Sequence, residues 1–424
     1  MMKIIFPRNI ENFVESITPK PSKLNEKKVK AIILDVKKNG DSAIKRYEKK
    51  FGGATLDSLR LSKKEIAYAY SKVSKKEITA IKLAKTRLSK TETIIKNQLK
   101  SSKINIDGIQ ITKLFSPIES VGCYVPGGLA RYSSTAIMSV VPAKIAGVKR
   151  IVVTSSPNKD GKLDPLTIVA ADLSGATEIY KTGGAQAIAA LSFGTKSIQK
   201  VDKIVGPGGP FVTLAKLLVS NNTAIDMMAG PTELGIIADN SADPNLIALD
   251  LISQAEHSSD TFCYLITTSS KFAKSVKQIL EKKMKNLKRG KIVKNSLFKN
   301  GFIAVLKSEN DVIKLANKLA PEHLEIISKN QNKISEKINS AGLLLVGKYS
   351  VSSASDYLFG SNHILPTNKF GKVRGSLSVL DFMKLGTKIK SSKTVLKKLS
   401  KYLEVITSAE ELPNHYEAVK GRLE

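Results

Sequence analysis

The stretch SVGCYVPGG (120–128) begins the part of the chain that decides the fold. A short apolar run ends there in a glycine turn, and a helical pattern follows at 133–147. The same order recurs downstream, in RIVVTSSP (150–157) with DPLTIVAADLSG (164–175), EIYKTGG (178–184) with AQAIAALSFG (185–194), and KIVGPGG (203–209) with PFVTLAKLLVS (210–220). Strands that alternate with helices predict βαβ units, whose right-handed crossovers build a parallel sheet.

A second α/β series begins at about residue 232. Its expected strands are 234–239, 262–269, 301–307, 323–328 and 342–348, with helical patterns at 246–260, 272–287 and 310–319. No Gly/Ser-rich linker separates the two series, so we expect them to share an interface, where ligand clefts often form. Residues 1 to about 100 and those after 376 have mostly helical patterns.

The prediction is therefore an α/β fold with two parallel-sheet, Rossmann-like βαβ domains and helical segments at both ends of the chain. Its divisions are a helical N-terminal region packing on the second α/β domain (1–115), the first βαβ domain (116–231), the second α/β domain (232–376) and a C-terminal helical tail (377–424). A chain of 424 residues with 42% hydrophobic content can form cores of this size.

The formal net charge of +31 raises the question of nucleic-acid binding. The lysines are, however, spread over nearly every expected helix, few aromatic residues lie among them, and no nucleic-acid motif is present. A solvated, lysine-rich surface is the favoured interpretation, and it would also concentrate anionic cofactors.

Cysteine usage and hydropathy indicate the compartment. The two cysteines, Cys123 and Cys263, have no CxxC spacing, which argues against a disulfide framework or a thiolate zinc site. The N-terminal apolar run is too short for a signal peptide, and no stretch approaches the roughly 20 apolar residues of a membrane helix. We expect a cytoplasmic protein without a membrane partner.

Three of the strand-to-helix turns in the first series are rich in glycine: Gly127-Gly128, Gly183-Gly184 and Gly206-Pro207-Gly208-Gly209. Glycines at such turns let backbone N–H groups approach a phosphate at a helix N-terminus. The GxGxxG spacing is absent, so the glycines are equally consistent with a nucleotide-binding site and with plain tight turns.

The segment LIALDLISQAEHSSD (246–260) combines an apolar helical stripe with polar groups near its end. Gln254 and His257 stand three residues apart, so on a helix they project from one face. Both can ligate a divalent ion, although taken alone the pattern is more typical of a polar helix end.

The other histidines change that balance. The chain has only four, and each lies near groups useful for chemistry: His257 near Gln254, His323 after Glu322, His363 after Asp356, and His415 after Glu410 and Glu411. Gln, His and Asp side chains can form a zinc site without cysteine. Glu322 and His323 have the makings of proton chemistry, because histidine is the usual general base and a carboxylate can activate water.

From about residue 30 to the C-terminus, the chain resembles the histidinol dehydrogenase family. The motifs that carry the resemblance are VGCYVPGG (121–128), GGAQAIAAL (183–191), KVDKIVGPG (200–208), IDMMAGPTE (225–233), SQAEH (253–257), APEHLEI (320–326) and GSNHILPT (360–367). Several long matches in the right order are more specific than any single motif.

The resemblance implies oxidation of L-histidinol to L-histidine through the aldehyde, in two NAD-dependent steps of histidine biosynthesis. It implies one zinc ion per subunit, bound by Gln254, His257, Asp356 and His415. It implies that His323 is the base for the alcohol proton and that Glu322 activates water to hydrate the aldehyde. The first βαβ domain would then be the NAD side and the second the metal and catalytic side.

The resemblance also implies binding residues and an oligomer. The substrate contacts would be the zinc ligands with Thr232, His323 and Glu410, and the NAD contacts would be Tyr124, Gln186 and the Gly209 position. Family members are homodimers in which the C-terminal histidine enters the partner's site, so His415 is expected to act in trans.

The chain departs from the family at two of these positions. Gly209 stands where the family has an asparagine that contacts NAD, and Thr232 stands where it has a serine. The alternatives to histidinol oxidation are a related zinc and NAD dehydrogenase of another polar alcohol, such as a sulfonated diol, and a basic nucleic-acid-binding protein.

Overall fold

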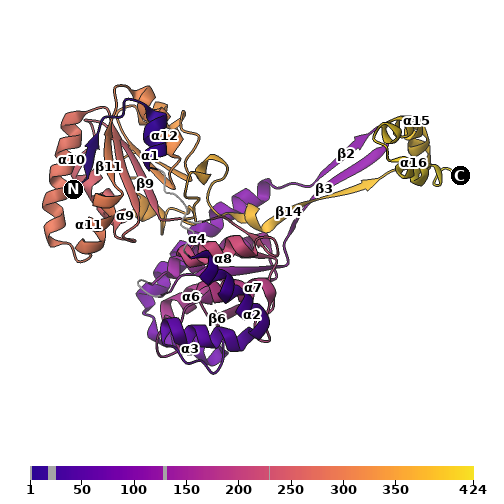
Figure 1. Cartoon of the computed structure of the whole chain (residues 1–424), viewed down its shortest axis with the longest axis horizontal. Helices are drawn as coiled ribbons and strands as arrows, with labels where there is room; N and C mark the ends of the chain where they lie inside the picture. Colours follow the sequence, from indigo (N-terminus) through magenta and orange to yellow (C-terminus); the bar gives the residue numbers. More distant parts are fainter. Residues whose placement is uncertain (1, 18–24, 128–130, 229) are drawn as a thin grey trace.

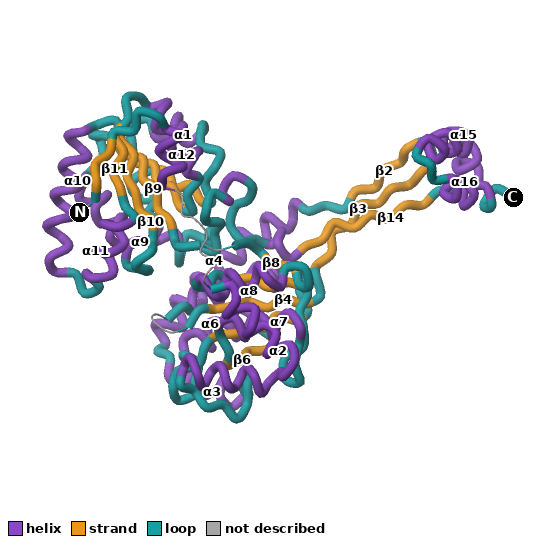
Figure 2. The backbone as a smooth tube through the Cα atoms, in the orientation of Figure 1, coloured by secondary structure: helices purple, strands orange, loops and turns teal. Residues whose placement is uncertain are grey.

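The computed structural model describes residues 2–17, 25–127, 131–228 and 230–424, so Gly128 of the first glycine turn lies outside the described residues. Two α/β bodies lie beside each other, and a long arm of strands leads away from them to the C-terminal helices (Figure 1). Figure 2 shows a sheet flanked by helices in each body. The predicted α/β fold with two parallel sheets is confirmed.

The first sheet has five parallel strands in the order β6-β5-β4-β7-β8. Its strands are β4 (Ser120–Val125), β5 (Arg150–Ser155), β6 (Glu178–Lys181), β7 (Lys203–Val205) and β8 (Ala224–Ile225). The intervening helices are α5 (Ser133–Ala146), α6 (Pro165–Ser174), α7 (Gly184–Phe193) and α8 (Pro210–Val219). The strand order reverses between β4 and β7, and in open α/β sheets ligands bind beyond the carboxyl ends of strands at such a reversal.

The second sheet has six parallel strands in the order β1-β11-β10-β9-β12-β13. They are β1 (Lys3–Ile5), β9 (Glu233–Ala238), β10 (Phe262–Thr267), β11 (Phe302–Val305), β12 (His323–Ile327) and β13 (Leu343–Val346). The helices with them are α1 (Ile10–Ile17), α9 (Pro244–Ala255), α10 (Ser270–Lys283), α11 (Gly290–Lys299), α12 (Glu309–Leu319), α13 (Gln331–Ser335) and α14 (Ser352–Ser355). Helices cover both faces, which explains the continuous apolar runs in the strands.

The N-terminal helices correct one part of the prediction. α2 (Glu26–Tyr47) packs on α7, α3 (Lys63–Lys72) on α6, and α4 (Lys75–Gln98) on α5, so they cover the first domain and not the second. β1 and α1 of this region join the second domain, through pairing of β1 with β11 and packing of α1 on α12. An apolar helix stripe shows that a face is buried but does not specify which sheet buries it.

The arm corrects a second part. An antiparallel sheet in the order β14-β3-β2 is formed by β2 (Ser102–Ile106), β3 (Ile109–Pro117) and β14 (Met383–Lys390), inside segments predicted to be helical. The β2–β3 turn at Asp107-Gly108 has φ of 50° and 91°, the positive values that a tight hairpin needs. The C-terminal helices α15 (Lys393–Ala409) and α16 (Pro413–Lys420) follow at its far end, as predicted.

Short helical turns complete the chain: η1 (Glu48–Gly52), η2 (Met284–Asn286), η3 (Phe370–Lys372) and η4 (Val379–Phe382). η1 is a π-helical turn, which often marks a functional site. Within the described residues, every helix is too short or too polar to cross a bilayer.

Candidate active site

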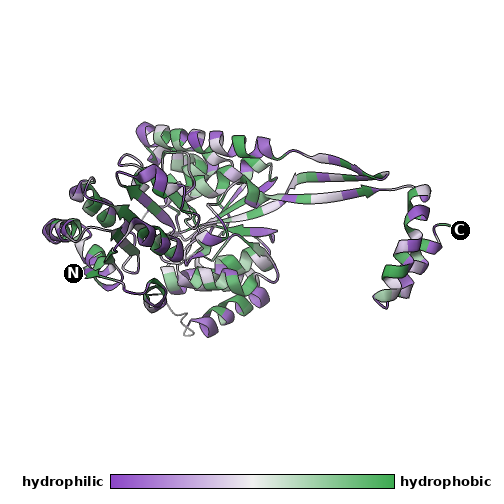
Figure 3. Cartoon of the chain, turned by 90° about the horizontal axis from the view of Figure 1, so that it is seen from above, coloured by the Kyte–Doolittle hydropathy of each residue, from purple (hydrophilic) through white to green (hydrophobic). Residues whose placement is uncertain are grey.

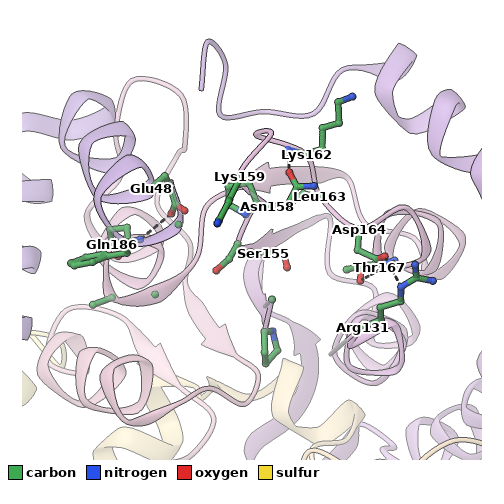
Figure 4. Close-up of a pocket in the computed structure, with 18 of the residues that line it drawn as sticks. Glu48, Arg131, Ser155, Asn158, Lys159, Lys162, Leu163, Asp164, Thr167 and Gln186 are labelled. Carbon is green, nitrogen blue, oxygen red and sulfur yellow. Dashed lines mark hydrogen bonds and ion pairs between the residues drawn. The ribbon is translucent and has the colours of Figure 1, made fainter. Parts of the chain in front are cut away.

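A cavity of about 990 Å³ lies beyond the carboxyl ends of the first sheet (Figure 4). It is lined by Pro126 and Gly127 after β4, by Ser155 at the end of β5 and by Gly184 after β6. The side chains of Arg131, Lys159 and Lys162 add positive charge, and Phe51 and Phe211 add aromatic surface. A cavity with cations, aromatic rings and backbone N–H groups at helix starts suits a nucleotide.

The predicted cofactor contacts lie at the same edge of the sheet. Tyr124 is buried, and its hydroxyl accepts a hydrogen bond of 3.1 Å from the Gly184 N–H. Gln186 lines the cavity from the start of α7. Gly209 precedes α8, and a Cβ added there would meet no atom within 4 Å, so a larger side chain would find open space at this position.

A second cluster of polar groups lies at the amino ends of β9 and β12. The His323 Nε2 atom is 3.3 Å from the Asp356 Oδ1 atom, and its Nδ1 atom is 3.2 Å from the Glu233 backbone oxygen. The Glu322 Oε2 atom is 3.7 Å from the same Nδ1 atom and accepts a 2.8 Å hydrogen bond from the Glu233 N–H. All of these side chains are buried. The structure therefore brings Glu322, His323 and Asp356 together.

The electrostatics of this cluster suit proton transfer. Burial raises the pKa of Glu322 to about 8. Burial lowers the pKa of His323, but the Glu322 and Asp356 carboxylates outweigh burial and raise it to about 9. Burial likewise raises the pKa of Asp356, but the neighbouring His323 outweighs it and holds that pKa below its usual value. Such displaced pKa values cluster at catalytic sites.

The α9 helix brings Gln254 and His257 to this region. Asp243 caps its start by accepting a 2.8 Å hydrogen bond from the Asn245 N–H, and α9 packs against α14, whose C-cap residue is Asp356. The buried Gln254 Nε2 atom has no hydrogen-bond partner among the described residues. His257 follows the helix. Desolvation lowers its pKa and outweighs the opposite effect of the nearby Asp356 carboxylate.

Two residues of the cluster were not among the predicted site residues. The His363 Nδ1 atom is 2.7 Å from the Asp356 backbone oxygen, and its Nε2 atom is 3.4 Å from the Thr135 hydroxyl on α5. Glu233 accepts hydrogen bonds from the Glu322 and Asn368 backbone N–H groups. The scarcity of histidine was a signal for His363, whereas the one signal for Glu233 was its place at the end of the motif IDMMAGPTE (225–233).

Three predicted residues lie at or beyond the edges of the cluster. Thr232 precedes Glu233, and its backbone oxygen accepts a 2.9 Å hydrogen bond from the Phe262 N–H. Glu410 and His415 are exposed, at the end of α15 and on α16, and one chain does not bring them to the cluster (Figure 1). Accordingly, no group of three or more His, Cys, Asp or Glu side chains in the described part of one chain could hold a metal ion.

Comparisons with known proteins agree on one family. A sequence model described as histidinol dehydrogenase matches residues 18–423. The chain is 42% identical to the histidinol dehydrogenase of Methanocaldococcus jannaschii, covering 99% of this chain and 95% of the relative. It is 41% identical to that of Methanococcus maripaludis, covering 96% and 100%. The crystal structure of histidinol dehydrogenase from Elizabethkingia anophelis superposes with a TM-score of 0.93 at 35% identity, covering 100% of this chain and 98% of that one. The chain belongs to the histidinol dehydrogenase family.

Proposed function

We propose that this protein oxidises L-histidinol through L-histidinaldehyde to L-histidine, with NAD as the hydride acceptor in both steps. Support comes from family membership over nearly the whole chain and from one observation above all: a buried histidine, His323, held between Glu322 and Asp356. The test is NADH formation that depends on histidinol, with sulfonated diols as the competing substrates. A rate with such a diol but none with histidinol would reject the proposal.

His323 suits the role of general base because its other ring nitrogen has a fixed partner. When the Nδ1–H group donates to the Glu233 backbone oxygen, the Nε2 atom is the one that exchanges a proton, and the Asp356 carboxylate at 3.3 Å stabilises its protonated form. Loss of that proton exposes the lone pair of the Nε2 atom. That atom faces Asp356 and the histidine side chains around it, where it can accept the proton of an alcohol. Hydride would leave the carbon that bears this hydroxyl group and pass to a cofactor in the neighbouring cavity.

Glu322 is proposed to activate the water that hydrates the aldehyde. A carboxyl group whose pKa burial raises to about 8 is basic enough to take a proton from water in the transition state. The backbone N–H of Glu233 holds its Oε2 atom at 2.8 Å and so orients the group.

Glu322→Gln keeps the shape of the side chain and an oxygen for the Glu233 N–H, but it removes the base. The aldehyde step is expected to slow by roughly 10²-fold and the alcohol step by far less, because only the former needs activated water. Rates measured separately with histidinol and with histidinaldehyde give this comparison. Equal losses in both steps would contradict the assignment.

Gln254, His257 and Asp356 are proposed to bind one zinc ion together with the His415 imidazole of a second copy. The mixture of amide-oxygen, imidazole and carboxylate ligands fits a zinc site without cysteine. When bound, the ion supplies a Lewis acid that orients the amine and imidazole nitrogens of the substrate.

His257→Ala is expected to lower zinc content and activity together, because it removes a ligand. Glu256→Gln is the matched control, since it changes the adjacent exposed carboxylate, which is not a predicted ligand. Metal analysis of both purified variants decides the point. Full zinc occupancy in His257→Ala would exclude this residue as a ligand.

A homodimer is proposed because the arm leaves an apolar surface uncovered. No residue of α15 or α16 is buried, and Tyr402, Val405 and Ile406 are 58%, 67% and 55% exposed. Figure 3 shows apolar residues along these C-terminal helices at the end of the arm. Apolar surface of this kind marks an interaction site. If a second copy covers this surface, Glu410 and His415 of the first copy would lie near the catalytic cluster of the second.

A cytoplasmic location is proposed from the two cysteines, which are free and buried. The retained Glu410 and His415 favour histidinol over a sulfonated diol, because the resemblance places them at the imidazole-bearing substrate. The positive charge is spread over the chain, and no described feature favours nucleic-acid binding over catalysis.

A further inference from the structure

Glu48 is a buried carboxylate outside the set of predicted site residues. It begins the π-helical turn η1 and lines the large cavity opposite the glycine turn after β6. Its Oε1 atom accepts hydrogen bonds of 2.9 Å from the Thr182 hydroxyl, the Gly183 N–H and the Gln186 side-chain amide. Glu48 therefore holds both the turn and the predicted cofactor contact Gln186.

The second carboxylate oxygen of Glu48 has no such role. The three hydrogen bonds to this side chain all end on Oε1, and no cation among the described residues contributes to its electrostatics. Burial raises the pKa of Glu48, while hydrogen bonds from Gly183, Gln186 and Thr182 oppose that rise. One oxygen of an unneutralised carboxylate is thus left as an acceptor at the wall of a nucleotide-sized cavity.

The two ends of the cavity differ in a way that orients a dinucleotide. Glu48 and Gln186 lie at one end, and Arg131 and Thr167 lie at the other (Figure 4). The Arg131 end leads to the catalytic cluster, because α5 begins two residues later and its Thr135 hydroxyl is 3.4 Å from His363. A hydride acceptor must lie toward that cluster, so the Glu48 end is left for the adenosine half.

We propose that Glu48 accepts a hydrogen bond from the adenosine ribose hydroxyls and thereby selects against a dinucleotide with a phosphate on that ribose. A carboxylate acceptor fits a ribose diol and repels a 2′-phosphate, which is how acidic residues distinguish the two cofactors in other dinucleotide folds. Phe51 and Phe211 line the cavity as well, and each offers a ring on which a base can stack. This inference rests on the proposed NAD-dependent function.

Glu48→Gln separates cofactor recognition from support of the turn. The glutamine oxygen can accept the same bonds from Thr182, Gly183 and Gln186, which turns its NH2 group toward the cavity in place of the acceptor. The KM for NAD is expected to rise about tenfold, the effect of losing a hydrogen bond to a charged group, while the KM for histidinol stays within about twofold. The ratio of kcat/KM for NADP to that for NAD should rise by a similar factor.

The matched control is Glu92→Gln. Glu92 is buried at 2% exposure, and it accepts one 2.6 Å hydrogen bond from the Val379 N–H, away from the cavity. The KM of the Glu92→Gln protein for NAD should equal that of the wild type. Assays at alkaline pH, which favours the ionised form of both carboxyl groups, give the comparison, and thermal melting shows that each variant is folded.

The outcomes distinguish the two proposals. Wild-type protein without histidinol-dependent NADH formation would reject the proposed function. An active Glu48→Gln variant with unchanged KM for NAD and unchanged cofactor preference would reject this inference alone and leave Glu48 as a support of the turn. Equal rises in the KM for NAD and for NADP would also overturn it.

Discussion

His323→Ala is expected to lower kcat by roughly 10²–10⁴-fold, the contribution of a positioned general base. The residue is buried between Glu322 and Asp356, and its ring is held by the Glu233 backbone oxygen, so no other described imidazole takes the same position. Zinc content should remain that of the wild type, because His323 is proposed as a base and not as a ligand. Steady-state kinetics and metal analysis on the same preparation measure both quantities.

Loss of the buried imidazole could also disturb folding, and thermal melting controls for that effect. His257→Ala provides the contrast, since it should lose zinc and activity together. A His323→Ala protein that melts like the wild type but contains no zinc would show that His323 ligates the metal. Retention of most activity would show that the base lies elsewhere.

His415→Ala is expected to abolish activity although His415 lies far from the cluster in its own chain. The proposal gives the imidazole to the zinc site of a second copy. Even outer-shell partners contribute about 10–100-fold to metal affinity, so a lost ligand should cost at least about 100-fold. Zinc titration and kinetics of the purified variant test this expectation.

Asn414→Ala is the matched control, because it changes the neighbouring exposed residue on the same helix. It should retain zinc and activity. A His415→Ala protein that binds zinc as tightly as the wild type would remove the residue from the ligand set, whatever its oligomeric state.

The parallel sheets could be predicted because each strand and helix is local in the sequence. Runs such as IVV in β5 and FCYLI in β10 are continuously apolar, as is typical of strands buried on both faces. The β2–β3 hairpin also had a local signal, since Asp107-Gly108 stands between alternating isoleucines, but the lysine-rich helices before it led to a helical prediction for the whole region.

The rest of the fold depends on contacts that the sequence does not display. β14 pairs with β3, and the Lys113–Thr387 hydrogen bond spans 274 positions. The packing of α2 on α7 was equally hidden, because an apolar stripe can face either sheet. Such pairings are fixed by the assembled molecule and not by local pattern.

The site residues also fall into those that the sequence indicated and those that it did not. His323 could be proposed from the sequence because histidine is scarce here and because the motif APEHLEI (320–326) contains it, and Asp356 because it precedes His363. Glu233 and Glu48 were missed because carboxylates are common along the chain, and only their burial and partners distinguish them. A role that arises from what surrounds a side chain becomes visible only in the folded chain.

The central claim is that the catalytic cluster of one copy works with the C-terminal arm of another. The most direct test mixes His323→Ala and His415→Ala proteins after dissociation and reassociation. A heterodimer would contain one site with both defects and one site with neither, so an equal mixture should recover roughly a quarter of the wild-type rate. If every site used its own chain's His415, the mixture would stay as inactive as its two components, and that result would contradict the account.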